Sequence, residues 1–123
     1  MTKEDIKILI CDDSILARKL LKDALMEIGC SNFVEAKNGE ESISLFLSES
    51  PDLVLLDIVM PIFNGVEVTK KIIDNDPQAN IVIVSSVGTK NFLEDALAAG
   101  AKDFIQKPFR SEMLDSIINK LCV

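Results

Sequence analysis

The chain has 123 residues, of which 48% are hydrophobic, enough for one folded core and too many for a disordered segment. Its 20 acidic and 13 basic residues give a formal net charge of −7 with no basic cluster, which argues against nucleic acid and anionic lipid as direct partners. The absence of histidine and the wide spacing of the three cysteines argue against a zinc site, a disulfide framework and a thiol–imidazole nucleophile.

Short β-rich runs alternate with longer helical patterns along the chain. Several of the runs are almost continuously apolar, which is typical of strands covered on both faces. The predicted strands are 6–11, 32–36, 52–56, 80–85 and 102–106. The predicted helices lie between Ser14 and Gly29, between Gly39 and Pro51, between Gly65 and Pro77, from about Phe92 to Gly100, and from Ser111 onward.

Five β–α units with right-handed crossovers predict an α/β fold, in which a parallel sheet carries helices on both faces. The sequence has no linker, internal repeat or low-complexity tract. The fifth helical pattern runs to the end of the chain. We therefore expect residues 1–123 to form one domain, with no separate output domain.

Polar residues follow the predicted strands at their carboxyl ends, where open parallel sheets bind their ligands. The first strand leads into an acidic pair, the third ends in another acid, and the fifth leads to a lysine. We expect these side chains to meet at one edge of the sheet. They are Asp12, Asp13, Asp57, Ser85, Ser86 and Lys107.

Three carboxylates in one cleft repel each other by up to ~4 kcal/mol per pair at ~4 Å and an effective dielectric near 20. A divalent cation with oxygen ligands reverses that cost, and Mg²⁺ fits best, with Mn²⁺ as the alternative. Mg²⁺ and Lys107 would make a positive pocket around Asp57, as phosphoryl transfer requires. The carboxylate of Asp57 could then act as a nucleophile and form an acyl phosphate, with Ser85 bonded to a phosphoryl oxygen.

Four motifs in order, "LICDDS", "PDLVLLDIVMPIFNG", "VSS" and "AGAKDFIQKPF", resemble those of a response-regulator receiver domain of the CheY type. The similarity covers the whole chain. It implies a flavodoxin-like, doubly wound (βα)5 fold with the strand order 2-1-3-4-5, for which CheY is a known example.

The resemblance also implies roles for individual residues. Asp57 corresponds to the phosphoacceptor. Asp13, Asp57 and the backbone carbonyl of Val59 correspond to direct Mg²⁺ ligands, and Asp12 assists through water. Ser85 and Lys107, two strand-end residues, correspond to the residues that contact the phosphoryl group.

Further positions correspond to switching and lifetime. Phe104 matches the aromatic switch residue, which moves together with Ser85. Val59 and Val87 match two positions that flank the path of attacking water, and valine at both predicts slow self-dephosphorylation. The peptide bond between Lys107 and Pro108 is often cis in the family.

The function implied is that of a stand-alone response regulator. It would accept a phosphoryl group from a histidine kinase and switch partner binding through the face formed by the fourth helix, fifth strand and fifth helix. It would not be an enzyme beyond its own phosphorylation and dephosphorylation. "SSVG" favours chemotaxis, with a flagellar switch or a phosphotransfer protein as target and a phosphatase as a further partner. Without a secretion signal or an apolar run of ~18 residues, the protein is expected in the cytoplasm and not in a membrane.

Alternative functions are a phosphorelay intermediate, an aspartyl-phosphate phosphatase, a flavodoxin-like cofactor binder and an interaction module that is never phosphorylated. Single residues also have purely structural interpretations. Asp13 could cap a helix, Asp52 could serve a turn, Phe104 could pack in the core and Lys107 could be solvated.

Overall fold

The structure, a computed structural model, describes residues 1–60, 63–86 and 90–122. Five strands alternate with five helices in these ranges, as the hydrophobic pattern predicted. In chain order the elements are β1 (Lys7–Cys11), α1 (Ile15–Glu27), β2 (Asn32–Ala36), α2 (Gly39–Glu49), β3 (Leu53–Asp57), α3 (Gly65–Asn75), β4 (Ile81–Ser85), α4 (Lys90–Ala99), β5 (Asp103–Gln106) and α5 (Ser111–Leu121).

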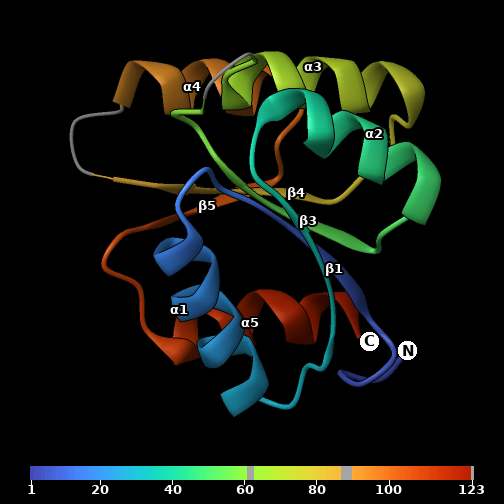
Figure 1. The fold of residues 1–123 in the computed structure, drawn as a ribbon, viewed down its shortest axis with the longest axis vertical. Coiled ribbons are helices and arrows are strands. Elements are labelled where there is room, and N and C mark those ends of the chain that lie inside the picture. The colour runs from blue at the N-terminus through green and yellow to red at the C-terminus, as the bar shows by residue number, and fades with distance from the viewer. Residues whose placement is uncertain (61–62, 87–89, 123) are drawn as a thin grey trace.

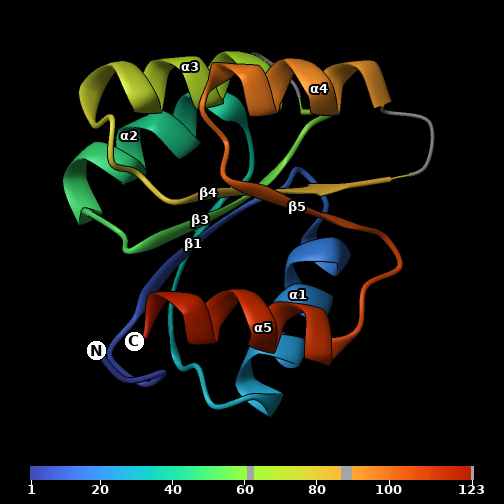
Figure 2. The same cartoon turned by 180° about the vertical axis from the view of Figure 1, so that it is seen from behind.

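The strands form one parallel sheet in the order β2-β1-β3-β4-β5, so the doubly wound topology is confirmed. Helices α2, α3 and α4 cover one face, and α1 and α5 cover the other (Figures 1 and 2). Alternate side chains of the central strands enter two separate cores. Leu9 and Leu56 join the α2–α4 side, whereas Ile10 and Leu55 join the α1–α5 side.

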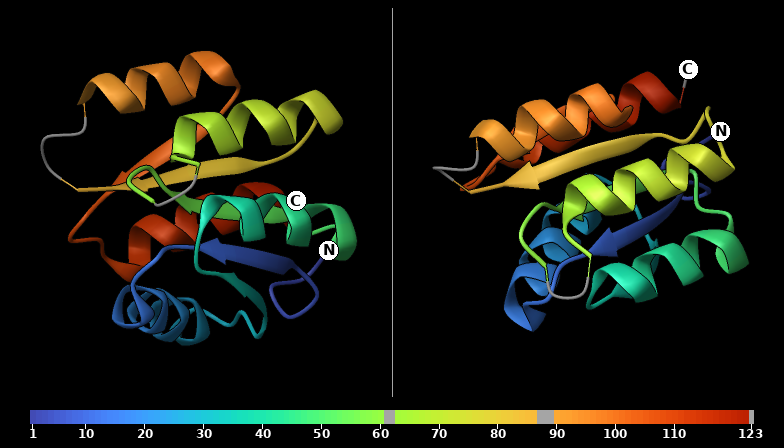
Figure 3. Two further views of the ribbon diagram at one scale, coloured as in Figure 1. Left: turned by 45° about the horizontal axis from the view of Figure 1, so that its top comes forward. Right: turned by 90° about the horizontal axis from the view of Figure 1, so that it is seen from above.

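The register of the sheet brings the carboxyl ends of the strands to one edge, which can be followed in Figure 3. Cys11 of β1 pairs with Leu56 of β3, and Asp57 pairs with Val84 of β4. Four of the strands begin one residue later than predicted and β3 extends one residue further, because a hydrophobic pattern does not fix the ends of a ladder. The extension makes Asp57 part of the sheet.

Polar side chains cap the starts of α1 and α3, the helices that follow the two strands leading into the acids. The side chain of Ser14 accepts a hydrogen bond from the backbone N–H of Ala17, which confirms the predicted N-cap of α1. Asn64 and Glu67 form a reciprocal capping box at the start of α3. These caps fix the first turns of both helices.

The cysteines of this chain are packing residues. Cys11 and Cys30 are buried, Cys122 is half-buried, and all three are free thiols. Burial raises the pKa of the Cys11 thiol to about 12, so it stays protonated and behaves as a small apolar side chain. Within the described ranges, every helix is too short or too polar to span a bilayer.

Candidate functional site

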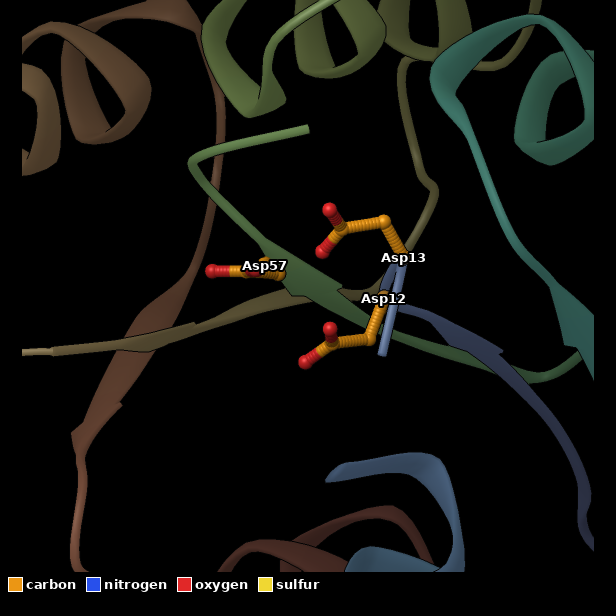
Figure 4. Close-up of side chains that lie close together, drawn as sticks. All are labelled: Asp12, Asp13 and Asp57. Atoms are coloured by element: carbon orange, nitrogen blue, oxygen red, sulfur yellow. The ribbon is translucent and has the colours of Figure 1, made fainter. Parts of the chain in front are cut away.

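Three carboxylates meet at the carboxyl edge of the sheet, as predicted. Asp12 and Asp13 follow β1, and Asp57 is the last residue of β3 (Figure 4). Each offers a carboxylate oxygen, and these oxygens all lie within 4.8 Å of one another. Asp12 is buried, Asp57 is half-buried and Asp13 is exposed. A compact set of oxygen donors with one open side fits Mg²⁺ or Mn²⁺.

Asp12 is held by contacts on both of its carboxylate oxygens. Lys107 Nζ lies 3.0 Å from Oδ2, and the backbone N–H of Ser14 donates to Oδ1 at 3.0 Å. The interpretation of Lys107 as a solvated surface residue is therefore wrong. The helix-cap interpretation of Asp13 is also wrong, because Ser14 caps α1.

The carboxyl group of Asp57 ionises less readily than that of an ordinary aspartate. Burial raises its pKa to about 6, and the negative charge of Asp12 contributes to the rise. The positive charge of Lys107 and a backbone hydrogen bond from Val59 lower this pKa, but they offset only part of the rise. A cation bound between the carboxylates would offset the repulsion that contributes to this rise.

Ser85 and Lys107 are fixed beside each other at the ends of neighbouring strands. Ser85 is the last residue of β4 and is buried, and its carbonyl oxygen accepts a hydrogen bond from the backbone N–H of Lys107 at 2.6 Å. The bond between Lys107 and Pro108 is cis. The structure thus brings together Asp12, Asp13, Asp57, Ser85 and Lys107, all from the predicted set.

Gly65 holds the start of α3 against the end of β3. Its N–H donates to the carbonyl oxygen of Ile58 at 2.7 Å. A Cβ atom at this position would lie 2.7 Å from the Asp57 carbonyl oxygen and 2.7 Å from the Ile58 Cα, closer than non-bonded atoms approach. The loop that follows Asp57 depends on this glycine.

The remaining predicted residues lie around the acid cluster or apart from it. Phe104, on β5, is 45% exposed, so its interpretation as a core aromatic is wrong for this structure. Val59 is 61% exposed just beyond Asp57. Val87 lies outside the described residues. Asp52 accepts a hydrogen bond from the N–H of Lys7 at the opposite edge of the sheet, a structural role as predicted.

Comparison with known proteins decides the family. The model of the response regulator receiver domain family matches residues 8–119. The chain belongs to this family. The receiver is 41% identical over 114 residues to the chemotaxis protein CheY of Bacillus subtilis strain 168, covering 93% of the chain and 95% of that protein. It is 38% identical over 115 residues to CheY of Thermotoga maritima, covering 94% and 96%.

Solved structures of similar receivers agree with the assignment of this chain to the family. A CheY-like receiver domain protein of Methanospirillum hungatei superposes with a TM-score of 0.85 at 27% identity, covering 95% of this chain and 94% of that one. CheY of Borrelia burgdorferi, in a complex with CheX, BeF₃ and Mg²⁺, gives a TM-score of 0.86 at 29% identity, covering 96% and 90%. Receiver domains are signalling proteins that bind Mg²⁺ at a cluster of aspartates, and this receiver has such a cluster.

Sequence reasoning missed one residue near the cluster. Arg18 of α1 donates a hydrogen bond from Nη1 to the backbone carbonyl of Asp12 at 2.6 Å. Nothing in the helical pattern distinguishes this arginine from a solvated one, because the contact depends on how α1 packs beside the end of β1. Gly65 was noticed as part of a motif, but its tight contact with β3 follows only from the packing.

Proposed function

We propose that this receiver accepts a phosphoryl group from a histidine kinase onto Asp57, with Mg²⁺, and that phosphorylation switches its affinity for a protein target. The observation that carries the proposal is the convergence of Asp12, Asp13 and Lys107 on Asp57 at the end of a central strand. A half-buried carboxylate surrounded by two acids and one amine matches the needs of phosphoryl transfer better than those of packing.

Each residue of the site has a task in this proposal. Asp12, Asp13, Asp57 and the carbonyl of Val59 would hold Mg²⁺, which neutralises the carboxylates and the phosphoryl oxygens when it is bound. A carboxylate oxygen of Asp57 attacks the phosphorus, and the bond from phosphorus to the donor histidine nitrogen breaks, with its electron pair staying on that nitrogen. The amine of Lys107 and the hydroxyl of Ser85 bind phosphoryl oxygens; both already lie at this edge of the sheet.

The switch surface in this proposal is the face formed by α4, β5 and α5. Phe104 is exposed there, and a groove of about 500 Å³ runs beside it, lined by residues of β5 and α5 that include Met113 and Ile117. Movement of the Ser85 hydroxyl toward the phosphoryl group would open space for the Phe104 ring to turn inward. Phosphorylation would thus favour one of two packings of this face.

Beryllofluoride with Mg²⁺ mimics the phosphoryl group and tests the proposal directly. We expect backbone NMR shifts to change at Asp57 and its neighbours and also along β5 and α5, including Phe104. Mg²⁺ alone and beryllofluoride alone serve as controls. Shift changes confined to the loops around Asp57 would contradict the switch, and no change at all would contradict the phosphoacceptor site.

The proposed setting is chemotaxis, because several of the similar proteins are chemotaxis proteins that match this chain over nearly their full length. The target would then be a component of a flagellar switch. A phosphotransfer protein that takes the phosphoryl group onward is the alternative target. A phosphatase is the further partner proposed, and the Borrelia structure, a complex of CheX and CheY with BeF₃ and Mg²⁺, supports a partner beyond the target.

The proposal also predicts a long-lived acyl phosphate. The exposed Val59 side chain lies beside Asp57 and has no group that could orient a water for in-line attack. Replacing Val59 with Asn and Val87 with Glu should speed phosphate loss about tenfold, which requires only ~1.4 kcal/mol of transition-state stabilisation. One well-placed hydrogen bond supplies that much.

Phosphate release from pre-phosphorylated protein in excess Mg²⁺ measures this lifetime. The single variants separate the two positions, and the change of Val59 to Ile is the control that keeps an apolar side chain. Equal or slower release from the double variant would show that these valines do not set the lifetime.

A further inference from the structure

Arg18 ties the turn after β1 to the edge strand of the sheet. Its side chain, only 12% exposed, donates from Nη1 to the carbonyl oxygen of Asp12 at 2.6 Å and from Nε to Glu35 Oε1 on β2 at 3.0 Å. The guanidinium group therefore adds a side-chain link between this turn and β2, next to the backbone hydrogen bond from the Asp12 N–H to the Ala36 carbonyl oxygen. The planar guanidinium group can donate two such hydrogen bonds at a fixed angle, whereas the ammonium group of lysine has no fixed pair of donors.

Glu35 is itself held in place for this contact. Lys22, one turn after Arg18 on α1, lies 2.9 Å from Glu35 Oε2, so the two carboxylate oxygens face two different cations. These hydrogen bonds, that of Lys22 foremost, lower the pKa of Glu35, and the carboxylate stays ionised near neutral pH. The anchor of Arg18 is thus a fully charged, doubly paired group.

We propose that Arg18 is a positioning residue for the metal site. By holding the Asp12 carbonyl, it fixes the backbone of the turn so that the carboxylates of Asp12 and Asp13 point toward Asp57. This inference rests on the proposed Mg²⁺ site. Arg18 does not touch the metal or the phosphoryl group; it acts through the backbone of Asp12.

The sign of the effect on Mg²⁺ affinity separates positioning from simple electrostatics. Arg18 places a positive charge near the acid cluster, so neutralising it should strengthen Mg²⁺ binding if charge alone mattered. If Arg18 positions the turn, its loss should weaken Mg²⁺ binding instead. Loss of groups that orient metal ligands typically weakens metal binding 10–100-fold, and we expect about 10-fold for Arg18→Gln.

The test is calorimetric titration of the metal-free protein with Mg²⁺, because the chain has no tryptophan or tyrosine to report by fluorescence. Arg18→Gln and Arg18→Lys should both bind Mg²⁺ more weakly, since lysine keeps the charge but not the fork. Lys19→Gln is the matched control: it removes a charge from the same helix and breaks an exposed pair with Asp23. Its Mg²⁺ affinity should stay at or slightly above that of the wild type.

Hydrogen exchange in the metal-free protein gives a readout that does not depend on Mg²⁺. The N–H of Asp12 donates to Ala36, and the N–H of Ser14 donates to Asp12 Oδ1. Both should exchange faster in Arg18→Gln than in Lys19→Gln, while the amides of β4 stay equally protected. Glu35→Gln keeps Arg18 but removes the charge that anchors it, so the amides of Asp12 and Ser14 should also exchange faster, though by less. This variant replaces Arg18→Gln in the test if Arg18→Gln does not fold.

Unchanged or tighter Mg²⁺ binding by Arg18→Gln, or full affinity in Arg18→Lys, would overturn the positioning role. Unchanged exchange at Asp12 and Ser14 would overturn it as well. If the wild type itself failed to bind Mg²⁺, the proposed function would fall instead, and the exchange experiment would still decide whether Arg18 holds the turn.

Discussion

Replacing Asp57 with asparagine is expected to abolish labelling of this receiver by acetyl phosphate in the presence of Mg²⁺. Asparagine keeps the shape of the side chain but lacks the carboxylate nucleophile that forms an acyl phosphate. Intact mass should show one added phosphoryl group on the wild type, none on the variant, and none on the wild type in EDTA.

Asp52→Asn is the matched control for this experiment. It makes the same chemical change at the opposite edge of the sheet, where the side-chain oxygen of asparagine can still accept the hydrogen bond from Lys7. The control should label like the wild type. Undiminished labelling of Asp57→Asn would show that another residue accepts the phosphoryl group.

The Asp57→Asn variant should also be more stable than the wild type at pH 7 in the absence of metal. Burial and the charge of Asp12 raise the pKa of Asp57 to about 6, so the folded state disfavours the ionised form. Stability is therefore lost as pH rises from about 4 through 6, and asparagine avoids this loss. Thermal unfolding in EDTA measures the difference, which should shrink when Mg²⁺ is added.

Replacing Gly65 with alanine is expected to damage both the fold and the metal site. The added methyl group would lie 2.7 Å from backbone atoms of Asp57 and Ile58, and backbone cannot move aside as a flexible side chain can. We expect the free energy of unfolding to fall by about 1–3 kcal/mol, as in overpacked sites. Because the displaced segment carries Asp57, Mg²⁺ should also bind more weakly.

Gly100→Ala is the control that separates the loss of stability in Gly65→Ala from its weaker Mg²⁺ binding. Gly100 has a φ of +124° and its added Cβ would meet the Ile73 side chain, so this variant also costs stability, about 1–3 kcal/mol. It lies at the end of α4, away from the acid cluster. Urea unfolding should show losses in both variants, whereas only Gly65→Ala should change Mg²⁺ affinity. Equal Mg²⁺ affinity in both would contradict the role of Gly65 at the site.

The fold and the acid cluster were predictable from the sequence because each rests on a local signal. The apolar runs and the helical stripes gave the elements, and the parallel topology then required Asp12, Asp13 and Asp57 to meet at one edge. The N-cap at Ser14 followed from the residue type and its place before an apolar pattern. The strand order came from the family resemblance, since spacing does not fix it.

Side-chain partners across the fold were not predictable in the same way. That Lys107 pairs with Asp12 depends on how β1 and β5 end, with β3 and β4 between them. Phe104 and the buried Ile105 point to opposite faces of β5, and which of the two faces the helices cover does not follow from the hydrophobic pattern. Arg18 and Glu35 lie 17 positions apart, and only the packing of α1 beside β2 makes them partners.

The pairing of Lys107 with Asp12 fixes the formal charge that a bound cation would have to balance. With every group ionised, the three carboxylates and the ammonium carry a formal charge of minus two, which one divalent cation cancels. A sodium or potassium ion would leave a residual charge in a partly buried place, where uncompensated charge is costly. A divalent cation would thus be favoured by charge alone, before size or coordination number enters, and the abundant monovalent salts of a cell should compete poorly for the cluster.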